Sequence, residues 1–237
     1  MAARCRPAPA WDTSLCLGAI VVINLPLVLV GQPRASLVLF PDAVRAGEWW
    51  RLVLHPFVHV SLYHLALDGL AFLLLLRSLD RLRPLERLAT AATTAATSAF
   101  AASLNGAELA AHGLCGLSGA AHGLMAASGL LMLCYGSSAD RRTGRWLVGL
   151  VSLKALFEAV TGRILFESLH FGRLGLPNAF CHLGGVLGGL VVAALLGGRV
   201  ARRRGAGLTA DRAGESAAAA TSLFRPGARA RPVAPAR

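Results

Sequence analysis

The amino-acid sequence predicts an all-α membrane protein built as a bundle of six transmembrane helices. Of its 237 residues 55% are hydrophobic and only 15% are charged, and the mean hydropathy is +0.57. A soluble domain carries about 25% charged residues. The apolar residues are mostly Leu, Ala, Val and Gly, and small residues let helices approach closely in a lipid environment.

Apolar segments recur along the chain at intervals that fit membrane helices. A spanning helix needs about 20 mainly apolar residues, and the candidates are 15–31, 62–76, 88–104, 114–135, 146–160 and 179–196. We therefore divide the chain into a cytoplasmic N-terminus (1–14), a membrane domain (15–198) and a basic tail (199–237). The tail is rich in Ala, Gly, Arg and Pro, which predicts disorder.

The positions of the arginines orient this bundle. Most lie in the N-terminus, in the 77–87 and 139–145 loops and just after the last apolar segment. The intervening loops hold fewer, namely Arg34, Arg45, Arg51, Arg163 and Arg173. By the positive-inside rule both termini face the cytoplasm, and the 32–61, 105–112 and 161–178 loops face outward.

The net charge of +12 does not indicate nucleic-acid binding, because the arginines fall in short runs between apolar segments, as membrane topology requires. The five cysteines are an odd number without metal-type spacing. The sequence predicts no cofactor. The partner that its composition predicts is the lipid bilayer.

Ser118 is the first residue that suggests chemistry. It lies about five residues into the fourth apolar segment, between Gly116 and Gly119. Such a serine often serves only for helix packing. A hydroxyl flanked by glycines near a helix N-terminus also suits a nucleophile, because a substrate backbone can approach and free N–H groups can bind an oxyanion.

His182 is the predicted partner of Ser118. It lies near the outward end of the sixth segment, and Gly185 and Gly189 follow on its helix face. Small residues on both segments favour close contact between them, and a neutral imidazole is a natural general base. His122 is an alternative base, because it lies one helix turn after Ser118.

The second apolar segment carries His64 and Asp68 one helix turn apart, and His55 and His59 precede it. We interpret His64 as a hydrogen-bond donor to an oxyanion. The alternative is a zinc site formed by the three histidines. In the fifth segment Lys154 and Glu158 lie four residues apart, which indicates mutual neutralisation. No third acidic residue is evident beside Ser118 and His182, so we expect a dyad.

These residues resemble the rhomboid family of intramembrane serine proteases over about 49–195. The resemblance rests on Trp50-Arg51-Leu52 with the histidines after it, on Gly116-x-Ser118-Gly119, and on His182 with its glycines. It implies a rhomboid-like six-helix bundle with Ser118 as nucleophile and His182 as base. It implies His64, and the position of Asp68, as oxyanion neighbours, although typical rhomboids have Asn there.

The string from Gly116 to Leu124 is similar to one bacterial branch, rhombosortase. This likeness implies substrates with a C-terminal Gly-Gly, helix and basic-cluster signal, cleaved at the bacterial inner membrane near its outer face. An inactive rhomboid-like protein that binds transmembrane helices is the alternative function. A small transporter using Lys154 and Glu158 would need paired broken helices in two halves, which the sequence does not show.

Overall fold

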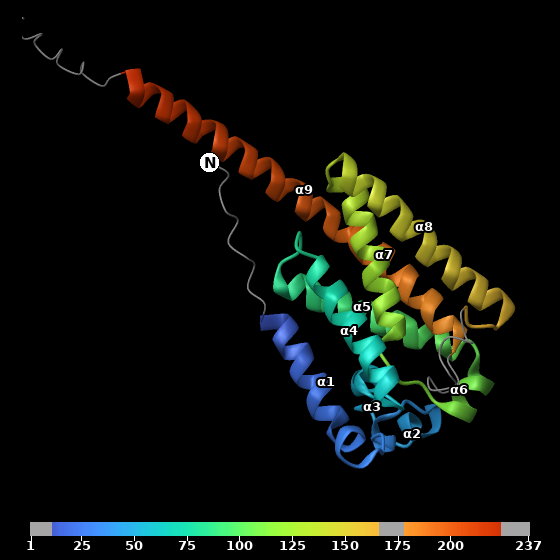
Figure 1. Cartoon of the computed structure of the whole chain (residues 1–237). Helices are drawn as coiled ribbons and strands as arrows, with labels where there is room; N and C mark the ends of the chain where they lie inside the picture. The colour runs from blue at the N-terminus through green and yellow to red at the C-terminus, as the bar shows by residue number, and fades with distance from the viewer. Residues whose placement is uncertain (1–10, 166–177, 224–237) are drawn as a thin grey trace, which may run out of the picture. The chain divides into compact units, whose positions relative to one another are not determined.

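The computed structural model describes residues 11–165 and 178–223, with side chains as far as Arg203. In these residues the regular structure is helical, which confirms the all-α prediction (Figure 1). The long helices are α1 (Trp11–Val30), α4 (Leu62–Ser78), α5 (Pro84–Ser103), α7 (Ser118–Tyr135), α8 (Ser138–Thr161) and α9 (Ala179–Leu223). They follow the order of the six apolar segments.

Local capping explains why α5 and α8 begin earlier than their apolar segments. Pro84 occupies the first turn of α5, and the Arg83 N–H donates to the Glu86 carboxylate at 2.9 Å. At α8, Ser137 and Asp140 form a reciprocal capping box. These polar signals precede the apolar residues, so hydropathy alone places both starts too late.

Two helices in the described residues are long and apolar enough to cross a membrane, α1 and the Ala179–Arg203 part of α9. The pair Arg51–Phe57 and Leu62–Ser78 makes a third if it is one span bent by 99°. The other long helices carry Ala and Thr (α5), Gly, Ser and His (α7), or charged residues (α8). The count of six spans therefore stays a prediction.

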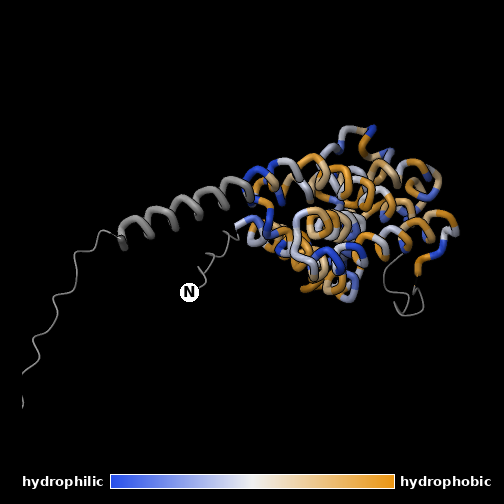
Figure 2. The backbone as a smooth tube through the Cα atoms, turned by 90° about the horizontal axis from the view of Figure 1, so that it is seen from above, coloured by the Kyte–Doolittle hydropathy of each residue, from blue (hydrophilic) through white to orange (hydrophobic). Residues whose placement is uncertain are grey.

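In this bundle polar side chains are buried and large apolar side chains are exposed, the reverse of the pattern in a soluble protein. Asn24 on α1 is 2% exposed, whereas Leu29 on the same helix is 74% exposed. Apolar residues colour much of the tube in Figure 2, and large apolar side chains are exposed on α1, α4, α8 and α9. Exposed apolar surface of this extent fits a lipid environment.

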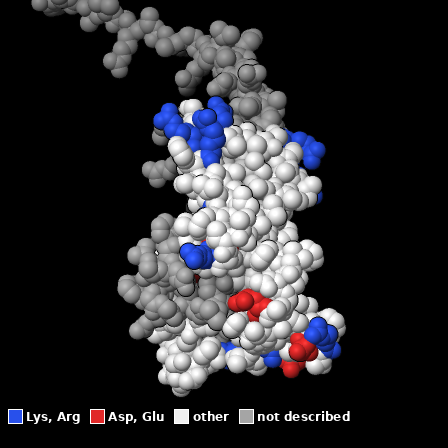
Figure 3. Space-filling view, turned by 90° about the vertical axis from the view of Figure 1, so that its right-hand side faces the viewer, with Lys and Arg blue, Asp and Glu red and all other residues white. Residues whose placement is uncertain are grey.

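Charged side chains gather mainly towards two ends of the face shown in Figure 3, with a broad uncharged zone between them. Inside the bundle, Arg87 of α5 donates through Nε and Nη2 to both carboxylate oxygens of Asp12 on α1, at 2.7 Å each. Asp12 is fully buried and Arg87 is 4% exposed. The pair ties α1 to α5, because a buried charge needs a partner.

Helix α7 lies at the centre of the bundle and contacts α4, α5 and α8 (Figure 1). Its glycines permit backbone-to-backbone contact. A Cβ on Gly144 of α8 would lie 2.5 Å from the Gly129 carbonyl oxygen of α7, and a Cβ on Gly185 of α9 would overlap the Gly119 carbonyl oxygen. Small residues thus set the separation of α8 and α9 from α7.

The connection between α1 and α4, predicted as a loop, contains η1 (Ala35–Leu37), α2 (Pro41–Arg45), α3 (Arg51–Leu54) and η2 (His55–Phe57). Arg51 holds it together: its guanidinium donates to the Ala35 and Val38 carbonyls and to Glu48. The predicted 105–112 loop is likewise largely helical, α6 (Gly106–His112). Much of the 161–178 loop lies outside the described residues.

The predicted disordered tail differs from the structure, in which α9 continues as helix to Leu223. The residues from Arg199 onward form a unit of their own. They are rich in Ala and Arg, which have high helix propensity. Composition alone therefore indicated disorder where the helix continues, and residues 224–237 lie outside the described part of the chain.

Substitution of Gly185 by Ala is expected to destabilise the bundle, because the new methyl group would overlap a backbone oxygen of α7. Overpacking of this kind costs about 1–3 kcal/mol. Gly149→Ala on α8 is the matched control, because a Cβ at Gly149 meets no atom within 4 Å. Thermal unfolding in detergent should show a lower midpoint for Gly185→Ala only; equal midpoints would contradict this account.

Candidate active site

Ser118 is the first residue of α7, not a residue one turn inside it. The chain before it is extended: Leu114 pairs with Leu39 through two backbone hydrogen bonds of 3.0 and 2.9 Å. Gly116 then adopts φ +97°, a conformation that favours glycine, and its N–H donates to the His55 carbonyl at 3.2 Å. This anchored turn fixes the position of the Ser118 hydroxyl.

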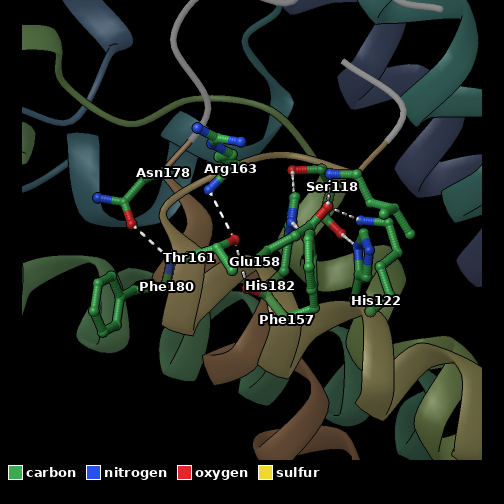
Figure 4. Close-up of polar contacts among 11 residues, drawn as sticks. Ser118, His122, Phe157, Glu158, Thr161, Arg163, Asn178, Phe180 and His182 are labelled. Atoms are coloured by element: carbon green, nitrogen blue, oxygen red, sulfur yellow. Dashed lines mark hydrogen bonds and ion pairs between the residues drawn. The ribbon is translucent and has the colours of Figure 1, made fainter. Parts of the chain in front are cut away.

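His182 lies in the first turns of α9, with Nε2 3.1 Å from the Ser118 Oγ. Its ring is 4% exposed. The start of α9 is fixed by Asn178, whose side-chain oxygen accepts from the Phe180 N–H at 3.0 Å. The structure thus brings together the two side chains that the sequence analysis singled out, across the close contact of α7 and α9 (Figure 4).

Glu158 is the residue that sequence reasoning missed. It comes from α8, is fully buried, and places Oε2 2.7 Å from His182 Nδ1. Its Oε1 lies 2.7 Å from Lys154 Nζ, the contact expected from the four-residue spacing. Glu158 therefore contacts both Lys154 and His182, and mutual neutralisation with Lys154 accounts for only one of its two oxygens. The available signal was a glutamate inside an apolar segment.

His122 lies against the other two groups, with its Nδ1 directed at the backbone of Ser118. Its ring stacks on the His182 ring with centroids 4.1 Å apart and planes 16° apart. Its Nδ1 lies 2.7 Å from the Ser118 backbone carbonyl, so it donates to the backbone of Ser118. It supports the His182 ring, while His182 Nε2 is the nitrogen that faces the hydroxyl.

His64 and Asp68 pair with each other on α4, with His64 Nε2 2.9 Å from Asp68 Oδ2. The Val60 N–H donates to His64 Nδ1 at 3.4 Å, so both ring nitrogens have a partner. A Cβ on Gly116 would lie 2.8 Å from His64 and 3.1 Å from Asp68. The pair packs under the turn that carries Ser118.

The arrangement does not favour the three-histidine zinc alternative. His55 Nδ1 contacts the Arg51 carbonyl at 2.9 Å, and His59 Nδ1 contacts the Phe57 carbonyl at 3.1 Å. Among the described residues, the group with ligand atoms within 4.8 Å of one another is His122, Glu158 and His182. Its imidazoles are stacked, and lone pairs in two parallel ring planes do not converge on one ion.

A small cavity of about 10 Å³ opens beside Ser118. Its lining includes Gly116, Gly119, His55, Ser98 and Cys181. The N–H groups of the first turn of α7 have no acceptor within the helix, because the carbonyls that they would need precede it. The site therefore combines a hydroxyl, an imidazole, a carboxylate and backbone donors, the groups required for nucleophilic acyl transfer.

A family model described as the Rhomboid domain matches residues 46–199 of this chain. The match spans the site residues from His55 to His182. No curated protein matches the sequence significantly.

Replacement of each histidine by Phe should separate the two candidate bases. Phe at position 122 can keep the stacking on His182, so we expect Ser118 to react with a fluorophosphonate probe within about tenfold of the original rate. His182→Phe removes the group that faces the hydroxyl and should lower this rate by about 10⁴-fold. Labelling followed by mass spectrometry measures both rates. A greater loss in His122→Phe would reverse the assignment.

Proposed function

The chain belongs to the rhomboid family of intramembrane serine proteases, and on that premise we propose that it is an intramembrane serine endopeptidase with Ser118 as nucleophile and His182 as general base. The observation that carries the proposal is the 3.1 Å contact between Ser118 Oγ and His182 Nε2. These groups come from two different helices, α7 and α9.

The proposed reaction begins when Ser118 Oγ attacks a substrate carbonyl while its proton moves to His182 Nε2. The first-turn N–H groups of α7 stabilise the negative oxygen of the tetrahedral intermediate. His182 then donates the proton to the leaving amine, and water hydrolyses the acyl enzyme by the reverse sequence. His64 stays a candidate oxyanion neighbour, which would have to exchange Asp68 for the substrate oxygen.

The proposed substrates are membrane-anchored proteins with a C-terminal Gly-Gly, helix and basic-cluster signal. The similarity of the Gly116–Leu124 string to rhombosortase supports this choice. Glycine also lowers the stability of a substrate helix by about 1 kcal/mol per residue relative to Ala. A Gly-Gly pair therefore gives an unwound, narrow strand, which suits a nucleophile beside a cavity as small as this one.

We place the enzyme in the bacterial inner membrane, with both termini in the cytoplasm and Ser118 nearer the outer face. The arginine-rich loops on one side of the predicted topology support this orientation. Water for the second step would then enter from the extracytoplasmic side.

An inactive rhomboid-like protein that binds transmembrane helices is the second candidate. Asp68, at the position where typical rhomboids have Asn, favours it, because an ionised carboxylate cannot donate to an oxyanion. The 2.9 Å contact of Asp68 Oδ2 with His64 Nε2 weakens this objection, because it gives the carboxylate a place beside His64 instead of at the substrate. Reaction of Ser118 with a fluorophosphonate would exclude the inactive alternative.

Ser118→Ala is expected to abolish cleavage of a membrane reporter that ends in a Gly-Gly, helix and basic-cluster signal. The physical reason is that no other hydroxyl faces His182 Nε2 among the described residues. Ser128→Ala removes a buried hydroxyl from the same helix, where it contacts Ser78, and serves as the matched control. Mass spectrometry of the new C-terminus gives the readout. Unchanged cleavage by Ser118→Ala would refute the proposal.

A further inference from the structure

We propose that Glu158 is a positioning residue that completes a Ser118–His182–Glu158 triad inside the membrane domain, with Lys154 as its counter-ion. This inference rests on the proposed protease activity and adds a residue to its machinery. The starting observation is that one fully buried carboxylate of α8 contacts the imidazole of α9 that faces the α7 hydroxyl.

The contacts of Glu158 divide between its two oxygens. Oε1 receives Lys154 Nζ at 2.7 Å and the Leu165 backbone N–H at 2.8 Å. Oε2 lies 2.7 Å from His182 Nδ1. An ion pair formed only to neutralise Lys154 does not require the second oxygen to face an imidazole 24 positions along the chain. The orientation of Oε2 therefore indicates a role towards His182.

The carboxylate also selects the tautomer of His182. An ionised carboxylate is an acceptor only, so the proton of a neutral His182 lies on Nδ1. Nε2 then presents its lone pair to the Ser118 O–H. This is the tautomer that a general base needs.

Lys154 and Glu158 keep the charge of the cluster low during proton transfer. With both present, the formal charge of Lys154, Glu158 and His182 rises from zero to +1 when His182 accepts the Ser118 proton. With a neutral residue at position 158, it would rise from +1 to +2 among groups that are 28%, 0% and 5% exposed. Glu158 thus stabilises the imidazolium, and Lys154 stabilises Glu158 beforehand.

The stacking of the His122 ring on the His182 ring further restrains the orientation of His182. His122 lies against one face of the imidazole, whereas Glu158 holds its edge at Nδ1. A ring fixed at one face and one edge keeps Nε2 directed at the hydroxyl. Figure 4 shows Ser118, His122, Glu158 and His182 drawn together from three helices.

The decisive variant is Glu158→Gln, which keeps size and removes charge. A Gln carbonyl turned to His182 leaves its NH₂ against Lys154 and the Leu165 N–H, so it cannot satisfy both sides. We expect kcat for the Gly-Gly reporter to fall about 10²–10⁴-fold, with KM within about threefold. The rate is normalised to the enzyme that folds, as measured by size-exclusion chromatography in detergent.

Asp12→Asn is the matched control for a structural role, because Asp12 is an equally buried carboxylate in an ion pair that does not touch His182. We expect it to lower the yield of folded protein and leave kcat of that fraction unchanged. A Glu158→Gln enzyme whose kcat equals the original, or falls no more than that of Asp12→Asn, would overturn the triad.

A measurement on the unsubstituted protein covers the case in which Glu158→Gln does not fold. Histidine labelled with ¹⁵N should show, at neutral pH, that His182 carries its proton on Nδ1, with the resonance assigned through His182→Asn. A proton on Nε2 would overturn the triad. Ser118→Ala separates the two proposals: if that variant still cleaves, the protease proposal fails, and if only Glu158→Gln cleaves normally, the triad alone fails.

Discussion

The close approach of α7 and α9 is the constraint on which the site depends. Gly185 lies so near the Gly119 carbonyl that no side chain fits between the helices, and Gly189 meets Gly123 in the same way one turn further along. Only at this separation can a serine at the start of one helix reach a histidine near the start of the other, at 3.1 Å. Gly119, Gly123, Gly185 and Gly189 are therefore part of the site's geometry, because they set the distance between α7 and α9.

A second set of contacts fixes the turn before Ser118 from the opposite side. Asn24, buried on the apolar helix α1, donates to the Phe57 carbonyl and accepts from the His59 N–H. The same short segment offers the His55 carbonyl to the Gly116 N–H. Buried backbone groups have no water to bond, so each requires such a partner. Through these bonds the polar residues of α1 and η2 fix the position of the turn before Ser118. The bonds are stable because the polar groups are buried inside the bundle.

The sequence predicted the parts of this site that short motifs carry and failed where a contact is long-range. Ser118 and His182 stand out because glycines mark both on apolar segments. Glu158 did not, because Lys154 at four residues' distance already accounted for its charge, and its contact with His182 depends on how α8 and α9 pack. The start of α7 was placed too early for a similar reason: Leu114 and Leu117 continue the apolar run, and only pairing with Leu39 makes the chain extended there.

The carboxylates of Glu158 and Asp68 lie at positions with opposite effects on the proposed reaction. Negative charge next to the general base favours proton transfer, whereas negative charge next to the oxyanion opposes it. Glu158 lies at Nδ1 of His182, on the side of the ring away from Ser118. Asp68 lies behind Gly116, where His64 Nε2 faces it. In the proposed reaction the oxyanion then depends on backbone N–H groups of α7, which need no particular side chain. On that proposal the chain can carry Asp at a position where typical rhomboids have Asn, because Asp68 lies beside His64 and need not donate to the substrate.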